Sequence, residues 1–273
     1  MRLKSAVAKV LKGVGAATLR PIGLIPAHRT RRETVQAFLD GLHPVDSGHP
    51  LIRLGPARDG GYLVPDDLRG ITACLSAGVG RDSGFELDCA NRGMDVFLTD
   101  ASVAGPACEH ERFRFQPMHL GPRDTATTTT LDRWAHESAG HHHDDLLLKI
   151  DIEGAEFDVL PGASDATMAR ARIVVIEFHE LQRLFVGAAF PMLRAAFDRL
   201  TTTHACVHIH PNNCCDEVTD GYFMLPRNAE FTFLRRDRLQ RSTPLRVFTH
   251  PLDADCTSRP SLVLSPRLFS DRA

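Results

Sequence analysis

The stretch LLLKIDIEGAEFDVL, residues 146–160, decides the fold. It opens with a nearly continuous apolar run and then places four acids, Asp151, Glu153, Glu156 and Asp158, close together. An apolar run of this length is typical of a central strand that is buried on both faces. Because a buried carboxylate is costly without solvent, a partner or a ligand, the acids mark the end of that strand. In open α/β sheets, ligands bind at this end of the strands.

The segments on either side alternate between strand and helix patterns. We expect strands within residues 71–80, 94–102, 111–120, 145–154, 171–180 and 204–210, and helices within residues 31–42, 83–93, 130–138, 155–163 and 189–200. Residues 51–54 and 62–64 predict a first hairpin, and residues 221–226 and 230–237 a second one that adds an antiparallel edge. Such alternation requires right-handed crossovers. The sequence therefore predicts an α/β domain with a mostly parallel sheet and helices on both faces.

The composition excludes several classes of protein. A formal net charge of −2 gives no reason to expect nucleic acid as a partner, and one Trp with two Tyr offers no stacking platform for single strands. The seven cysteines include no CxxC pair, which favours a reduced, cytoplasmic chain over a disulfide framework. No apolar run is long enough to predict a transmembrane helix.

The N-terminus has a charge pattern of its own. The first 32 residues hold eight Lys or Arg and no acid, and apolar residues recur at helical spacing from Leu3 to Val14. We therefore expect residues 1–50 to form a basic helical extension and residues 51–273 to form the main domain. The first helix either packs on the domain, which is the preferred interpretation, or makes peripheral contact with an anionic membrane surface.

A glycine-rich turn follows the first strand of the predicted sheet. Gly78 and Gly80 suit a tight turn that lets a ligand approach the backbone, and Ser83 and Glu86 have the spacing of a capping box. Asp100 ends the next strand, 22 residues after Gly78, where an acid receives hydrogen bonds from ribose hydroxyls. The turn therefore predicts a site for an adenosine-type cofactor.

Two features favour S-adenosyl-L-methionine over a nicotinamide dinucleotide. The third glycine stands at Gly84, so the spacing is GxGxxxG, whereas dinucleotide-binding domains have GxGxxG. The predicted sheet also ends in a hairpin, where a dinucleotide-binding domain would continue with a second βαβ half.

Three segments of the chain carry a resemblance to a known family. The line LDRWAH…LLLKIDIEGAEFDVLPGA…IVVIEFHE resembles the FkbM family of S-adenosylmethionine-dependent methyltransferases, over roughly residues 50–235. The resemblance implies a Rossmann-like class I methyltransferase fold with a mostly parallel seven-stranded sheet. It also implies O-methylation of a hydroxyl, with Gly78 and Gly80 at the cofactor loop and Asp100 at the ribose. The chain departs from many methyltransferases because Ser76 and Ala77 precede the first glycine, where those enzymes have an acid. We therefore expect the methionine amino group to bind Glu86 or backbone carbonyls.

Methyl transfer requires an aligned sulfonium methyl group and a hydroxyl that loses its proton. We expect Asp151 at the tip of its strand, with Glu177 and His179 on one face of the next strand and His208 on a further one. Asp151, Glu177 and His179 would hold a divalent cation such as Mg²⁺ or Mn²⁺.

Two alternatives to the metal site stay open. Without a metal, His179 or His208 would act as the general base. The same side chains would otherwise be hydrogen-bonded polar residues under a loop. Glu156 and Asp158 are interpreted as the solvated start of a helix.

The function that we infer from the sequence is O-methylation of a saccharide, glycolipid or natural product. The alternatives are an NAD-dependent oxidoreductase on a similar sheet and a catalytically inactive, methyltransferase-like binding module. A homo-oligomer is compatible with the sequence, which identifies neither the acceptor nor the position methylated.

Overall fold

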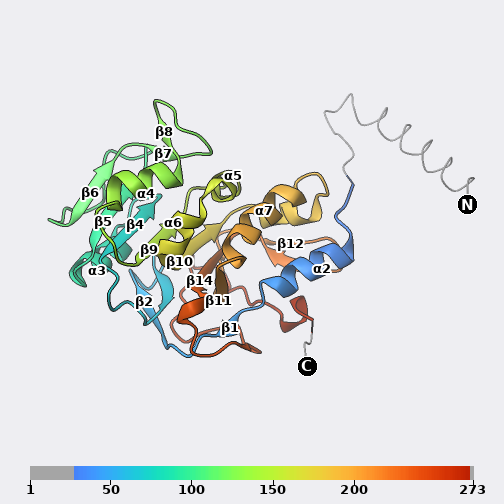
Figure 1. Cartoon of the computed structure of the whole chain (residues 1–273). Coiled ribbons are helices and arrows are strands. Elements are labelled where there is room, and N and C mark those ends of the chain that lie inside the picture. The colour runs from blue at the N-terminus through green and yellow to red at the C-terminus, as the bar shows by residue number, and fades with distance from the viewer. Residues whose placement is uncertain (1–27, 271–273) are drawn as a thin grey trace, which may run out of the picture.

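A seven-stranded sheet forms the centre of the computed structural model, which describes residues 28–270 (Figure 1). The strands lie in the order β11-β14-β10-β9-β4-β5-β6. Their bounds are β4 Ala73–Ala77, β5 Asp95–Thr99, β6 Phe113–Gln116, β9 Leu146–Ile150, β10 Ala171–Phe178, β11 His204–Pro211 and β14 Ala229–Arg235. All of them run parallel except β14, which is antiparallel to both of its neighbours. The predicted α/β fold with a mostly parallel sheet is confirmed.

The position of the antiparallel strand differs from the expectation. β14 does not lie at the edge, because it inserts between β10 and β11 and leaves β11 outermost. Phe231, Phe233 and Leu234 are buried, so β14 has apolar side chains on both of its faces. A position inside the sheet buries both faces under the packed layers. Residues 221–226 do not join the sheet, since β13 (Met224–Pro226) pairs with β12 (Glu217–Thr219) in a separate hairpin.

Helices cover the two faces of the sheet unequally. The helices are α2 Arg32–Gly41, α3 Gly84–Asn91, α4 Leu131–Ala139, α5 Glu156–Val159, α6 Asp165–Arg170 and α7 Phe190–Thr201. The first face packs against α2, α4, α5, α6 and α7, and the second packs against α3 and the hairpin of β2 (Leu51–Leu54) and β3 (Tyr62–Pro65). Along β10, Val174 and Ile176 point to the first face, whereas Ile173 and Val175 point to the second. The same alternation sends Glu177 and His179 toward the hairpin.

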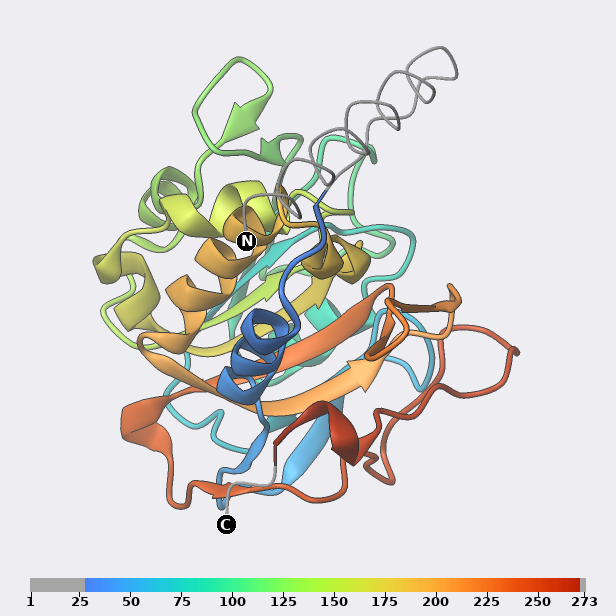
Figure 2. The same cartoon turned by 90° about the vertical axis from the view of Figure 1, so that its right-hand side faces the viewer.

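The remaining elements are short. Two small strand pairs join β1 (Val45–Asp46) to β15 (Thr243–Pro244), and β7 (His119–Leu120) to β8 (Thr128–Thr129). From β15 to the end of the described chain, the C-terminal segment has no further strand and crosses the outer end of the sheet (Figure 2).

Helix α2 is part of the same packed body as the sheet. The helix lies across the sheet in Figure 2. Val35 and Leu39 are buried in the main core, and the Phe38 ring lies 5.1 Å from that of Phe197 in α7. Packing therefore continues across residue 50, where the sequence suggested a boundary. The predicted basic helix lies in residues 1–27, outside the described residues. No described helix has the length and apolar character needed to cross a membrane.

The predicted capping box of α3 is wrong. The Ser83 side chain does not cap the helix, because its Oγ accepts a hydrogen bond from the Ala107 amide at 2.9 Å. Glu86 instead points into the protein and accepts a hydrogen bond from the Ser76 hydroxyl at 2.5 Å. The buried hydroxyl of Ser76 on β4 is therefore the partner of Glu86, and the capping contact with Ser83 is not formed.

Candidate active site

A cavity of about 390 Å³ opens at the carboxyl ends of β4, β5 and β9. Its walls include the β4–α3 loop, Asp100, Lys149, Asp151 and the loop before β3. All four predicted cofactor residues line it, namely Gly78, Gly80, Glu86 and Asp100. Ligands of open parallel sheets bind at this place, so the cavity is the candidate cofactor site.

The two glycines of the β4–α3 loop have different reasons to be glycine. Gly78 has φ +81°, and a Cβ there would lie 1.6 Å from the carbonyl oxygen of Asp151. Gly80 has φ +59°, and a Cβ there would meet nothing within 4 Å. Gly78 is therefore required by the close backbone of Asp151, directly after β9, whereas the open space at Gly80 is available to a ligand.

Asp100 holds the β4–α3 loop in place. Its Oδ2 accepts hydrogen bonds from the amides of Val79 at 2.9 Å and Gly80 at 3.4 Å, and its Oδ1 accepts from the Ser102 amide and hydroxyl. Burial acts to raise the pKa of Asp100, but these hydrogen bonds outweigh it and hold the pKa below its usual value. A carboxylate offers about four acceptor positions, so a ribose hydroxyl would replace one of these donors. The long bond from Gly80 is the weakest of them.

Glu86 and Lys149 form a buried charged pair at the cavity. Lys149 Nζ lies 3.9 Å from Glu86 Oε1 and donates a hydrogen bond to the Gly78 carbonyl. Lys149 belongs to the KIDIEGAE stretch, and no pattern in the sequence predicted a role for it. The Glu86 side chain therefore lies at the cavity, where an amino group would find a hydrogen-bond acceptor.

The structure brings the three predicted metal ligands together. Asp151, Glu177 and His179 each offer one ligand atom, and these atoms lie within 4.8 Å of one another. His179 Nε2 is 3.9 Å from Asp151 Oδ1 and 3.7 Å from Glu177 Oε1. The Tyr62 hydroxyl donates to Asp151 Oδ2 at 2.9 Å, which fixes that carboxylate beside the cofactor cavity.

Glu156 is not the solvated helix residue that we expected. It is 0% exposed, and its Oε1 accepts hydrogen bonds from the amides of Ile152 and Gly154 at 3.1 Å. The same oxygen lies 3.1 Å from His179 Nδ1, so it directs Nε2 toward Asp151. A carboxylate that orients an imidazole in this way is common behind metal ligands. Asp158 is exposed, as expected.

The protonation of the cluster reflects an excess of acids. Burial, followed by the charge of Asp151, raises the pKa of Glu177 to about 8. Burial acts to lower the pKa of His179, but the hydrogen bond to Glu156 and the nearby carboxylates outweigh it and raise the pKa to about 9. An imidazole with this pKa is protonated near pH 7 and is a poor general base there. A divalent cation fits the donor set, because two carboxylates and an oriented imidazole are ligands that such ions accept.

His208 does not join the cluster. Its Nε2 lies 2.9 Å from Asp253 Oδ1, and β14 separates its strand from β10. Asp253 belongs to the irregular C-terminal segment, and no pattern in the sequence pointed to it. Asn212 also has a partner inside the protein, because its Nδ2 donates to Glu177 Oε1 at 2.7 Å.

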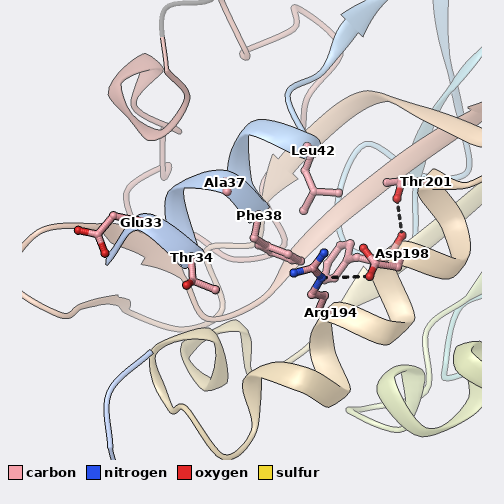
Figure 3. A pocket seen from close by; sticks show the side chains of 10 residues that line it. Glu33, Thr34, Ala37, Phe38, Leu42, Arg194, Asp198 and Thr201 are labelled. Atoms are coloured by element: carbon pink, nitrogen blue, oxygen red, sulfur yellow. Dashed lines mark hydrogen bonds and ion pairs between the residues drawn. The ribbon is translucent and has the colours of Figure 1, made fainter. Parts of the chain in front are cut away.

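A second cavity, of about 360 Å³, lies between α2 and α7 (Figure 3). Phe38, Leu42 and Phe197 line it, together with the ion pair of Arg194 and Asp198, whose Nε and Oδ2 are 3.1 Å apart. None of the predicted site residues reaches this cavity. It is therefore separate from the candidate active site.

Comparisons with known proteins agree with the site at the level of the family. Residues 62–204, slightly more than half of the 273-residue chain, match the model of the methyltransferase FkbM domain. A solved TehB-like SAM-dependent methyltransferase from Corynebacterium glutamicum is 13% identical, with a TM-score of 0.28 over 60% of this chain and 80% of that one. The structure of EvdMO1 is also 13% identical, with a TM-score of 0.26 over 75% of this chain and 47% of that one. No curated protein matches the sequence.

Proposed function

The chain belongs to the FkbM family of S-adenosylmethionine-dependent methyltransferases, and from this premise we propose that it methylates a hydroxyl oxygen of a saccharide, glycolipid or natural product with the help of a divalent cation. The observation that carries the proposal is the convergence of Asp151, Glu177 and His179 beside the cofactor cavity. Asp151 lines that cavity and belongs to the cluster, so an acceptor held at the cluster would lie next to the methyl donor.

The residues of the cavity suit the two ends of S-adenosylmethionine, which supplies an electrophilic methyl group when it is bound. Asp100 stands where the ribose hydroxyls are expected, and Glu86 where the amino group of the methionine part is expected. Gly80 leaves room for the cofactor to approach the loop backbone.

The second requirement is removal of the proton from the acceptor hydroxyl. A divalent cation supplies a Lewis acid that lowers the pKa of a bound hydroxyl. Asp151, Glu177 and His179 would hold the cation, and Glu156 would keep His179 oriented toward it. The hydrogen bond from Tyr62 holds the Asp151 carboxylate at the cavity, where Asp151 would contact the cation. His179 is unsuited to act as a base without the cation, because its pKa lies near 9.

Calorimetry and a turnover assay test the proposal in separate steps. Wild-type protein should bind S-adenosylhomocysteine, and a chelator should abolish methyl transfer to hydroxyl acceptors until Mg²⁺ or Mn²⁺ is added. Asp151→Asn should abolish turnover and keep S-adenosylhomocysteine binding, whereas the matched control Asp158→Asn should behave as wild type because Asp158 is exposed. Full activity of the chelator-treated enzyme would remove the cation from the mechanism. Cofactor binding without methylation of any hydroxyl acceptor would favour the binding module.

A further inference from the structure

Asn212 connects the loop after β11 to one of the candidate metal ligands. It follows directly after the last residue of β11, and it is only 5% exposed. Its Nδ2 donates a hydrogen bond to Glu177 Oε1 at 2.7 Å, although β14 lies between the strands of the two residues. The same Oε1 lies 3.7 Å from His179 Nε2. Asn212 therefore acts on the oxygen of Glu177 that is close to another candidate ligand.

The side-chain amide of Asn212 can adopt only one orientation. Its Oδ1 accepts hydrogen bonds from the Cys214 amide at 2.8 Å and from the Cys256 thiol at 2.6 Å. A backbone N–H is always a donor, so the atom that faces Cys214 must be the oxygen and the group that faces Glu177 must be the NH₂. The contact with the amide two residues further on is an Asx turn, which holds the side chain against its own backbone. Glu177 therefore meets a donor that is fixed in place.

This donor is the only one that fixes the Glu177 carboxylate. Within residues 28–270, no other group donates a hydrogen bond to it. Carboxylates that bind a metal are in general held by hydrogen bonds from side chains that do not touch the ion. Glu156 has this relation to His179, and Asn212 has it to Glu177. Two of the three candidate ligands are thus oriented from behind, each by a different part of the chain.

The neighbouring Asn213 has similar properties but different partners. It is 2% exposed, and its Nδ2 donates a hydrogen bond to the Arg259 carbonyl at 2.8 Å. Its Oδ1 accepts from the Thr257 amide at 3.0 Å. Among the described residues 28–270, none of its hydrogen bonds reaches Glu177. Asn213 attaches the C-terminal segment to the loop, so it provides a matched control for Asn212.

We propose that Asn212 is a positioning residue, which holds the Glu177 carboxylate in the orientation that binds the divalent cation. This inference rests on the proposed function and adds to its cation site a residue from the loop after β11. Asn212 does not bind the cation itself, because its oxygen is directed at Cys214 and Cys256, and its NH₂ group only donates hydrogen bonds.

Asn212→Ser separates the contact with Glu177 from the shape of the loop. A serine hydroxyl can still accept from the Cys214 amide, as it does in turns of this type, but it is too short to reach Glu177. Mn²⁺ would be titrated by calorimetry into protein saturated with S-adenosylhomocysteine. Asn212→Ser should bind Mn²⁺ about 10–100-fold more weakly than the wild type and should keep its affinity for S-adenosylhomocysteine. Asn212→Thr, which keeps the same acceptor on a bulkier side chain, should behave in the same way.

The control Asn213→Ser should lower Tm, because bonds to the C-terminal segment are lost, and should bind Mn²⁺ as the wild type does. Wild-type affinity for Mn²⁺ in Asn212→Ser, or an equal loss of affinity in Asn213→Ser, would overturn the role of Asn212. Failure of both Asn212 variants to fold or to bind S-adenosylhomocysteine would also overturn it, since Asn212 would then support the fold in general. A wild type that binds S-adenosylhomocysteine but no Mn²⁺ would instead contradict the cation in the proposed function.

Discussion

Alanine at Gly78 should mainly destabilise the fold, whereas alanine at Gly80 should mainly weaken cofactor binding, although the two glycines share one loop. At Gly78 the new Cβ would lie 1.6 Å from the carbonyl oxygen of Asp151, so the junction between β4 and β9 must open. Overpacking of this kind costs about 3 kcal/mol or more, since backbone is the obstacle and cannot rotate away. At Gly80 the Cβ has open space, and only the left-handed backbone is unfavourable, by about 1 kcal/mol. For a domain of this size, 1 kcal/mol shifts Tm by about 2–4 °C.

Thermal unfolding and calorimetry with S-adenosylhomocysteine measure the two effects separately. Gly78→Ala should lower Tm by about 6 °C or more. Gly80→Ala should lower Tm by only a few degrees and weaken binding, because its methyl group enters the candidate cofactor cavity. A Gly78→Ala protein with wild-type Tm would refute the close approach of loop and strand. A Gly80→Ala protein with wild-type affinity would refute the position of the cofactor.

Three further variants test individual interactions. Glu156→Gln should lower the free energy of unfolding by roughly 1–3 kcal/mol in urea titrations, because a buried charged acceptor of amide and His179 hydrogen bonds is lost; unchanged stability would contradict its buried role. Burial lowers the pKa of His204 to about 4, so the unfolded chain, with a pKa near 6.5, binds a proton that the folded chain does not. The free energy of unfolding should therefore fall by about 3 kcal/mol as the pH drops from about 6.5 to about 4, and His204→Gln should reduce this pH dependence. The same pH dependence in the wild type and in the variant would contradict the role of His204. The Arg53 guanidinium binds several backbone carbonyls, including those of Gly61 and Leu252, and a lysine cannot bind them all. Arg53→Lys should therefore loosen the loop before β3 and weaken S-adenosylhomocysteine binding about tenfold. An unchanged Kd would show that this loop keeps its conformation without Arg53.

The parts of the site that follow strand periodicity could be predicted from the sequence. The run LLLKI forms β9 and IVVIEF forms most of β10, and the two strands are parallel neighbours. The carboxyl ends of such neighbours meet at one edge of the sheet, and alternation puts Glu177 and His179 on one face. Strand order and alternation alone therefore predict the cluster of Asp151, Glu177 and His179.

The parts that depend on contacts between distant segments could not be predicted. The position of β14 between β10 and β11 depends on which strands have an edge free for pairing. Local sequence patterns do not determine this pairing. The acids around Glu156 are typical of the solvated start of a helix. Its burial follows from the turn that brings the amides of Ile152 and Gly154 to its carboxylate. Asp253 contacts His208 from an irregular segment, whose sequence shows no strand or helix periodicity from which the contact could be predicted.

The most direct test of the account is titration calorimetry of Mn²⁺ into protein saturated with S-adenosylhomocysteine. The account predicts one binding site for Mn²⁺ in the wild type and in Asp158→Asn, and loss of that site in Glu177→Gln. Because the cation competes with protons for this cluster, the measured affinity should also weaken as the pH is lowered. Absence of Mn²⁺ binding to the wild type, or equal binding to Glu177→Gln, would contradict the claim that these strand ends hold a catalytic cation.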